Sequence, residues 1–78
     1  MDTDGIRQAL EGGLTDLDMQ MEADVNKISL LLVSPSFEGL NRVKRQQLVY
    51  KLLNDRISSG EVHAVMMKTL TPAENADG

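Results

Sequence analysis

Two neighbouring stretches of the sequence have the residue patterns of β-strands, and they limit the folds that the chain can adopt. The first alternates apolar Leu17, Met19, Met21 and Ala23 with polar Asp16, Asp18, Gln20 and Glu22. Because successive side chains of a strand point to opposite faces, this pattern predicts a half-buried strand with one wet face. Residues 28–33 are apolar on nearly both faces, which predicts a strand that is central or covered on both sides. The short loop at 24–27 joins the two strands into a predicted antiparallel hairpin.

A long helix is predicted after the hairpin. Pro35 ends the second strand because proline cannot continue a hydrogen-bonded ladder, and residues 37–39 predict a turn or a single helical turn. Asn41 can then cap a helix that runs to about Ile57. A helical wheel places Val43, Val49, Tyr50, Leu53 and Ile57 on one broad apolar face and Leu48 and Leu52 on a smaller one.

The remaining segments complete an α-β-β-α-β order. Residues 3–11 predict a short helix that Thr3 or Asp4 caps and that Gly12-Gly13 ends. Residues 61–70 predict a third strand, and the long helix before it allows this strand to pair in parallel with a hairpin strand. The expected fold is one small α/β (α+β) domain over residues 1–78, with a three-stranded mixed sheet and helices on one face. We expect an ordered core over about 3–71 and a frayed polar tail over 72–78.

Composition limits the classes of function. The 78 residues suffice for one modest core, and the absence of Cys excludes disulfides and thiolate chemistry of the chain's own. No nucleophile–base–acid set and no glycine-rich phosphate loop can be assembled, so we do not expect an enzyme. No apolar run reaches the length of a membrane helix, and the start Met1-Asp2-Thr3-Asp4 is acidic where a signal peptide is basic. A soluble cytoplasmic protein is therefore expected.

Positive charge is concentrated in one segment of an acidic chain. The net charge of −4 weighs against nonspecific nucleic-acid binding as the main activity. The segment 41–56 nevertheless contains Arg42, Lys44, Arg45, Lys51 and Arg56 against a single acid, Asp55. This cluster predicts either a solvated helix face or a local basic surface that binds an acidic partner or DNA.

His63 is the only histidine in the sequence. From its position alone, at the start of a strand, a surface or boundary residue is the more common interpretation. Structural metal sites need about four ligands, and this chain has no Cys to supply them. If His63 binds a metal, a partner must therefore provide the other ligands.

Two motifs are similar to those of a known family. Residues 36–50, read as Ser-Phe-Glu-Gly-Leu-Asn-Arg-Val-Lys-Arg-Gln-Gln-Leu-Val-Tyr, resemble the signature of the BolA/IbaG family, and Gln46-Gln47 resembles the IbaG branch. Residues 62–72 resemble the closing strand of that family, in which His-Ala leads to Lys and then Thr-Pro. With the predicted hairpin, the resemblance covers nearly the whole chain.

The resemblance implies a fold and a function. The family fold is α-β-β-α-α-β, similar to the type II KH topology. Members are non-enzymatic partners of monothiol glutaredoxins in iron–sulfur trafficking or iron regulation, monomeric alone and heterodimeric with the partner. The pair can share a 2Fe-2S cluster with glutathione, and the resemblance assigns the ligand role to His63. If the chain is such a partner, we expect the basic helix start and the Met66-Met67-Lys68 region, including the candidate Lys68, to lie close to the partner surface.

An alternative function and one departure accompany the resemblance. Some members are described as DNA-binding transcription regulators of stress response and cell shape, and Arg42, Lys44, Arg45 and Lys51 are the residues that would bind DNA here. The family places a second ligand, His or Cys, in the hairpin loop, but residues 24–27 contain neither. Asp24 offers only a hard oxygen ligand, so the partner keeps two thiol ligands there or the two proteins bind without a cluster. The Gly-x-x-Gly loop of KH domains is also absent, so RNA binding is not expected.

Overall fold

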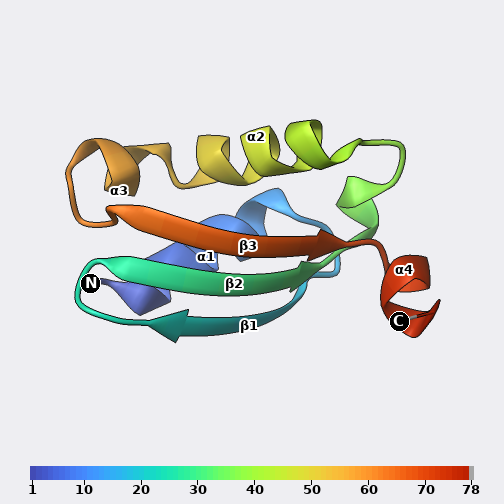
Figure 1. The fold of residues 1–78 in the computed structure, drawn as a ribbon, viewed down its shortest axis with the longest axis horizontal. Helices are drawn as coiled ribbons and strands as arrows, with labels where there is room; N and C mark the ends of the chain where they lie inside the picture. Colours follow the sequence, from blue (N-terminus) through green and yellow to red (C-terminus); the bar gives the residue numbers. More distant parts are fainter. Residues whose placement is uncertain (78) are drawn as a thin grey trace.

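A computed structural model describes residues 1–77 and confirms the α-β-β-α-α-β order (Figure 1). Its elements are α1 (Thr3–Gly13), β1 (Asp18–Ala23), β2 (Lys27–Val33), the 3-10 turn η1 (Pro35–Phe37), α2 (Arg42–Leu52), α3 (Asn54–Ser58), β3 (Ala64–Leu70) and α4 (Pro72–Asp77). Within residues 1–77 no helix has the length and apolar character needed to cross a membrane.

The three strands form one mixed sheet in the order β1-β2-β3. Strands β1 and β2 are antiparallel, with Met21 opposite Leu30, and β2 and β3 are parallel, with Leu30 opposite Met67. The predicted hairpin, the central position of the apolar second strand and the parallel crossover are all confirmed. In β1, Met19 and Met21 pack against the core while Asp18, Gln20 and Glu22 are exposed, as the alternation predicts.

The core lies between one face of the sheet and helices α1 to α3. Its buried residues are Ile6, Leu10, Leu14, Ile28, Leu30, Leu32, Phe37, Val49, Leu53 and Val62. Every element except α4 contributes to this set or packs against it, since burial of apolar area is the main driving force available to a chain without disulfides. The first helix begins at Thr3 as expected, but its cap is Asp2, whose carboxylate accepts the Gly5 N–H at 2.9 Å, and not Thr3 or Asp4.

Helix α1 ends at Gly13, so the helix stops at the predicted glycine pair, two residues later than the expected last residue. A Cβ atom at Gly13 would collide with the Leu52 side chain, so the glycine allows α1 and α2 to approach closely. Helix α1 contacts α2 directly. The close packing of the two helices, which a pattern within one segment does not reveal, therefore favours a glycine at position 13.

The apolar face of α2 is narrower than the helical wheel indicates. Val49 and Leu53 are fully buried, but Val43 is 59% exposed and Tyr50 is 43% exposed. At 3.6 residues per turn Val43 lies about 120° from Val49, which takes it away from the face that contacts α1 and β3. The predicted helix to Ile57 is also divided, because Leu53 (φ −101°, ψ 7°) leaves the helical conformation between α2 and α3.

The polar tail is not frayed over residues 72–77, where α4 is held by an ion pair. The Arg45 Nη1 donates to Glu74 Oε1 at 2.7 Å, and the Thr71 N–H donates to the same oxygen at 2.8 Å. The Glu74 N–H in turn donates to Thr71 Oγ1 at 3.2 Å, which completes a reciprocal helix cap. The Arg45 guanidinium and the Thr71 N–H lower the pKa of Glu74 from 4.5 to about 2. Residue 78 of the predicted tail lies outside the described residues.

The first test concerns the buried face of α2. We expect Leu53→Ala to lower the free energy of unfolding by about 2–5 kcal/mol, because it leaves a cavity where a fully buried side chain was. Val43→Ala serves as the control, and we expect a change within about 0.5 kcal/mol, since Val43 is exposed. Urea unfolding followed by far-ultraviolet circular dichroism measures both, and equal losses would contradict the assigned face.

The second test concerns the Arg45–Glu74 ion pair. Because the pKa of folded Glu74 lies below 4.5, the ionised carboxylate stabilises the fold at neutral pH, and this contribution is lost as pH falls from 4.5 to about 2. The stability difference between wild type and Glu74→Gln should therefore shrink across that interval. Urea midpoints measured at a series of pH values test this. Asp77→Asn is the control on the same helix, and a Glu74→Gln difference that stays constant down to pH 2 would refute the assignment.

Candidate functional site

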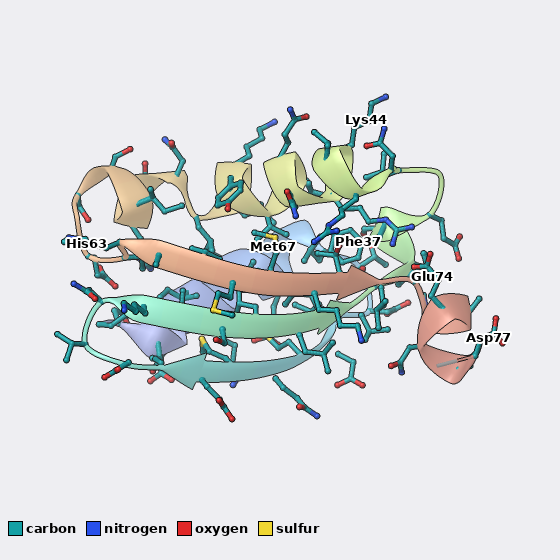
Figure 2. All side chains as sticks on the ribbon, in the orientation of Figure 1. Phe37, Lys44, His63, Met67, Glu74 and Asp77 are labelled. Atoms are coloured by element: carbon teal, nitrogen blue, oxygen red, sulfur yellow. The ribbon has the colours of Figure 1, made fainter. Side chains whose placement is uncertain are left out.

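His63 lies where α3 returns to the sheet, one residue before β3 and beside the hairpin loop (Figure 2). Gly60, with a left-handed φ of 83°, turns the chain after α3. The His63 N–H then donates to the Asn26 carbonyl at 2.7 Å, which starts the parallel pairing of β3 with β2. The imidazole is exposed at this end of the molecule.

Asn26 also contacts the imidazole through its side chain. The Asn26 Nδ2 lies 3.2 Å from His63 Nδ1, so the amide fixes the ring from the Nδ1 side. An amide has a donor and an acceptor end, so it can serve either tautomer of the ring, and such contacts orient histidines that bind metals. Sequence reasoning missed Asn26, because only the register of β2 with β3 brings it beside His63.

The hairpin loop adds no soft ligand to His63. The Asp24 carboxylate accepts the Val25 N–H at 2.8 Å, so one of its oxygens is already used in the loop. Among residues 1–77 no group of three His, Cys, Asp or Glu side chains could hold a metal ion. This end of the molecule therefore presents one oriented imidazole, and the Val25 side chain of the hairpin loop is exposed, which suits a metal centre completed by another protein.

A second polar region lies at the other end of β3. An open groove of about 700 Å³ separates the first turn of α2 from the end of β3. Its lining residues are Leu40, Asn41, Arg42, Arg45, Gln46, Met67, Lys68, Thr69 and Glu74. Asn41 caps α2 as predicted, because its Oδ1 accepts the Lys44 N–H at 2.9 Å. The groove brings three of the predicted basic residues together, whereas Lys44 and Lys51 are exposed on α2 and do not line it.

Arg45 differs from the other basic residues because its guanidinium is bonded within the chain. Its side chain is only 13% exposed. The Nε donates to the Leu40 carbonyl at 2.8 Å, and Nη1 donates to the Thr69 carbonyl at 3.2 Å and to Glu74. Arg45 therefore connects the start of α2, the end of β3 and α4, while Arg42 and Lys44 are exposed to solvent.

His63 and the groove lie at opposite ends of β3. Lys68 lies five positions after His63, which corresponds to about 16 Å along an extended strand. Figure 2 shows Lys44, in the first turn of α2, at the end of the molecule away from His63. The basic helix start therefore lies at the other end of β3 from His63, because α2 begins beside the last residues of β3, and its closeness to the partner surface stays a prediction.

Comparisons with known proteins agree with the fold and the motifs. The family model described as BolA-like protein matches residues 17–74. The acid stress protein IbaG of Escherichia coli strain K12 is 34% identical over 74 residues, which are 95% of this chain and 88% of that protein. The solved structure of BolA1 from Arabidopsis thaliana matches with a TM-score of 0.85 at 31% identity, over 95% of both chains.

A second solved structure, the BolA domain of SufE1 from Arabidopsis thaliana, matches with a TM-score of 0.84 at 33% identity. The match covers 95% of this chain and 98% of that one. The match to the family model, the relatives at this level of identity and the shared three-stranded fold show that the chain belongs to the BolA-like protein family.

Proposed function

We propose that this chain is a non-enzymatic partner of monothiol glutaredoxins and shares a 2Fe-2S cluster with them through His63. The observation that carries the proposal is the exposed imidazole, which Asn26 holds from the Nδ1 side in a chain without Cys. The proposed role is iron–sulfur cluster trafficking or iron regulation in the cytoplasm. The chain would be monomeric alone and would form a heterodimer with its partner.

The ligand requirement of the cluster supports this division between two proteins. Each iron of a 2Fe-2S cluster needs ligands from outside the cluster, and this chain supplies no thiolate and a single imidazole, that of His63. The glutaredoxin Cys and glutathione would supply thiolates. Imidazole in place of thiolate is chemically reasonable, since Rieske centres bind one iron through two histidines. The cluster is then cargo of the complex and not a cofactor that this chain holds alone.

Asn26 would act as a positioning residue for His63. A metal on Nε2 requires that nitrogen to be unprotonated, so the ring proton must sit on Nδ1. After a rotation of its amide, Asn26 can accept a hydrogen bond from the protonated Nδ1 through its side-chain oxygen. That hydrogen bond would fix the tautomer in which Nε2 is free to bind the cluster. The hydrogen bond between the two main chains keeps the residues adjacent throughout.

The experiment mixes the protein with a monothiol glutaredoxin that carries its cluster and records the visible circular dichroism spectrum. We expect wild type to change the spectrum and His63→Ala to abolish the change. Asp24→Ala is the matched control in the neighbouring loop, and we expect it to retain the change, because the Asp24 oxygen is a poor ligand for the cluster. Spectra that do not change, together with no complex in gel filtration, would refute the proposal.

A DNA-binding regulator of stress response or cell shape is the second candidate. Arg42, Lys44 and Lys51 are all exposed on α2, which favours it, whereas the net charge of −4 opposes it. If this candidate holds, the affinity for duplex DNA should fall steeply with salt, and Lys44→Ala should reduce that slope by about one unit. Fluorescence anisotropy at several salt concentrations measures the slope, and an unchanged slope would argue against this face.

A further inference from the structure

We propose that the groove between the first turn of α2 and the end of β3 binds an acidic segment of a partner protein, and that Glu74 occupies the groove until that segment displaces it. This docking surface is separate from the His63 end of the molecule and does not depend on a cluster. The argument rests on the geometry of Arg45, the position of Arg42 and the weak attachment of α4.

Arg45 is already arranged to receive a carboxylate. The Leu40 and Thr69 carbonyls accept from Nε and Nη1 and hold the guanidinium at a fixed orientation. Glu74 approaches the remaining edge, with Oε1 at 2.7 Å from Nη1 and Oε2 at 3.4 Å from Nη2. This two-oxygen approach is the geometry in which arginine recognises carboxylates, and the fixed guanidinium lowers the ordering cost of binding.

Arg42 provides a second positive charge in the same groove. It lines the groove and is exposed. Among residues 1–77 the side-chain ion pairs are Arg45–Glu74 and Arg56–Asp2, so no acid of the described chain neutralises Arg42. One internal carboxylate therefore faces two guanidinium groups, which leaves the groove with an excess of positive charge for a second acid.

The attachment of Glu74 is weak enough to be exchanged. Helix α4 has six residues, none of them buried, and its Glu74 side chain is 47% exposed. The reciprocal cap with Thr71, the ion pair with Arg45 and one hydrogen bond from the Asn75 N–H to the Thr71 carbonyl are its polar attachments to the rest of the described chain. Departure of Glu74 alone would leave the largely buried Arg45 cation without a counterion, which is costly. Exchange for an incoming carboxylate avoids that cost.

The arrangement favours a short acidic peptide over a nucleic acid. Proteins gain affinity for the phosphates of duplex DNA from many cations that follow the backbone, and here three cations, Arg42, Arg45 and Lys68, line one groove. The net charge of −4 repels a long polyanion, whereas one or two carboxylates interact mainly with the local cations. Charge complementarity therefore selects an acidic peptide segment.

The test uses a fluorescein-labelled oligoglutamate peptide and fluorescence anisotropy with the full chain. We expect Glu74→Gln to bind the peptide about tenfold more tightly than wild type. This gain follows if Glu74 occupies the groove of the wild-type protein for all but about a tenth of the time. The amide oxygen of Gln can still accept from the Thr71 N–H, so α4 should remain capped. Asp77→Asn is the charge-matched control on α4 and should bind like wild type.

A second pair of variants locates the peptide. In the Glu74→Gln background, Arg42→Ala should weaken binding about tenfold, the order of magnitude for loss of one charge-assisted contact. Lys44→Ala removes the same charge two residues further along α2 but outside the groove, and it should change affinity by less than about twofold. Equal losses in the two variants would mean that only general attraction is measured, and this would overturn the proposal.

Amide chemical shifts of the wild-type protein provide a measurement that does not depend on any variant. Saturating peptide should shift the amides of Gln46 and Thr69 and of α4 and leave those of His63 and Asn26 unchanged. The absence of these shifts would overturn the proposal. It would also be overturned if a DNA oligonucleotide displaced the peptide at equal or lower concentration with the same dependence on Glu74, because the groove would then recognise phosphates.

Discussion

The parallel pairing of β2 with β3 positions both candidate sites. Parallel strands need a long crossover connection, which α2 and α3 provide. The two helices cover the face of the sheet on which the buried side chains of Ile28, Leu30 and Leu32 lie. The crossover returns the chain at His63, where the first hydrogen bond of the pairing joins it to Asn26. At the other end of β3, the Thr69 carbonyl accepts from Arg45 and so connects the sheet to the start of α2. The same register thus determines the surroundings of the imidazole and of the groove.

Much of the architecture could be predicted because its signals are local. The alternation in β1, the apolar run in β2 and the cap at Asn41 each depend on a few adjacent residues, and the structure confirms them. The helical pattern alone predicts one continuous helix to about Ile57. The family resemblance implies two consecutive helices and so predicts the second half of the crossover, α3.

The incorrect predictions involve contacts between distant segments. The exposure of Val43 depends on how α2 packs on α1 and β3. The order of α4 depends on Arg45, which lies 29 residues before Glu74. Asn26 was missed as a partner of His63 for the same reason, since 37 residues separate them. A pattern within one segment contains no information on such pairs.

The two ends of the molecule offer different chemistry to partners. One end presents a single oriented imidazole in a chain without Cys, and the other presents a fixed guanidinium already paired with a carboxylate. Their separation along β3 would allow one protein to contact both ends or two proteins to bind at once. The net charge of −4 repels an acidic partner as a whole. Binding of the proposed acidic segment would therefore rely on the local positive charge of the groove.

The central claim is that the imidazole of His63 binds an iron of the shared cluster. Because the chain contains one His, labelling with ¹⁵N-histidine marks this residue alone. The most direct measurement is pulsed electron paramagnetic resonance of the reduced complex between the labelled protein and an unlabelled cluster-loaded glutaredoxin. A strongly coupled nitrogen signal that changes from ¹⁴N to ¹⁵N frequencies on labelling is the expected result. Nitrogen signals that are identical in labelled and unlabelled complexes would contradict the account.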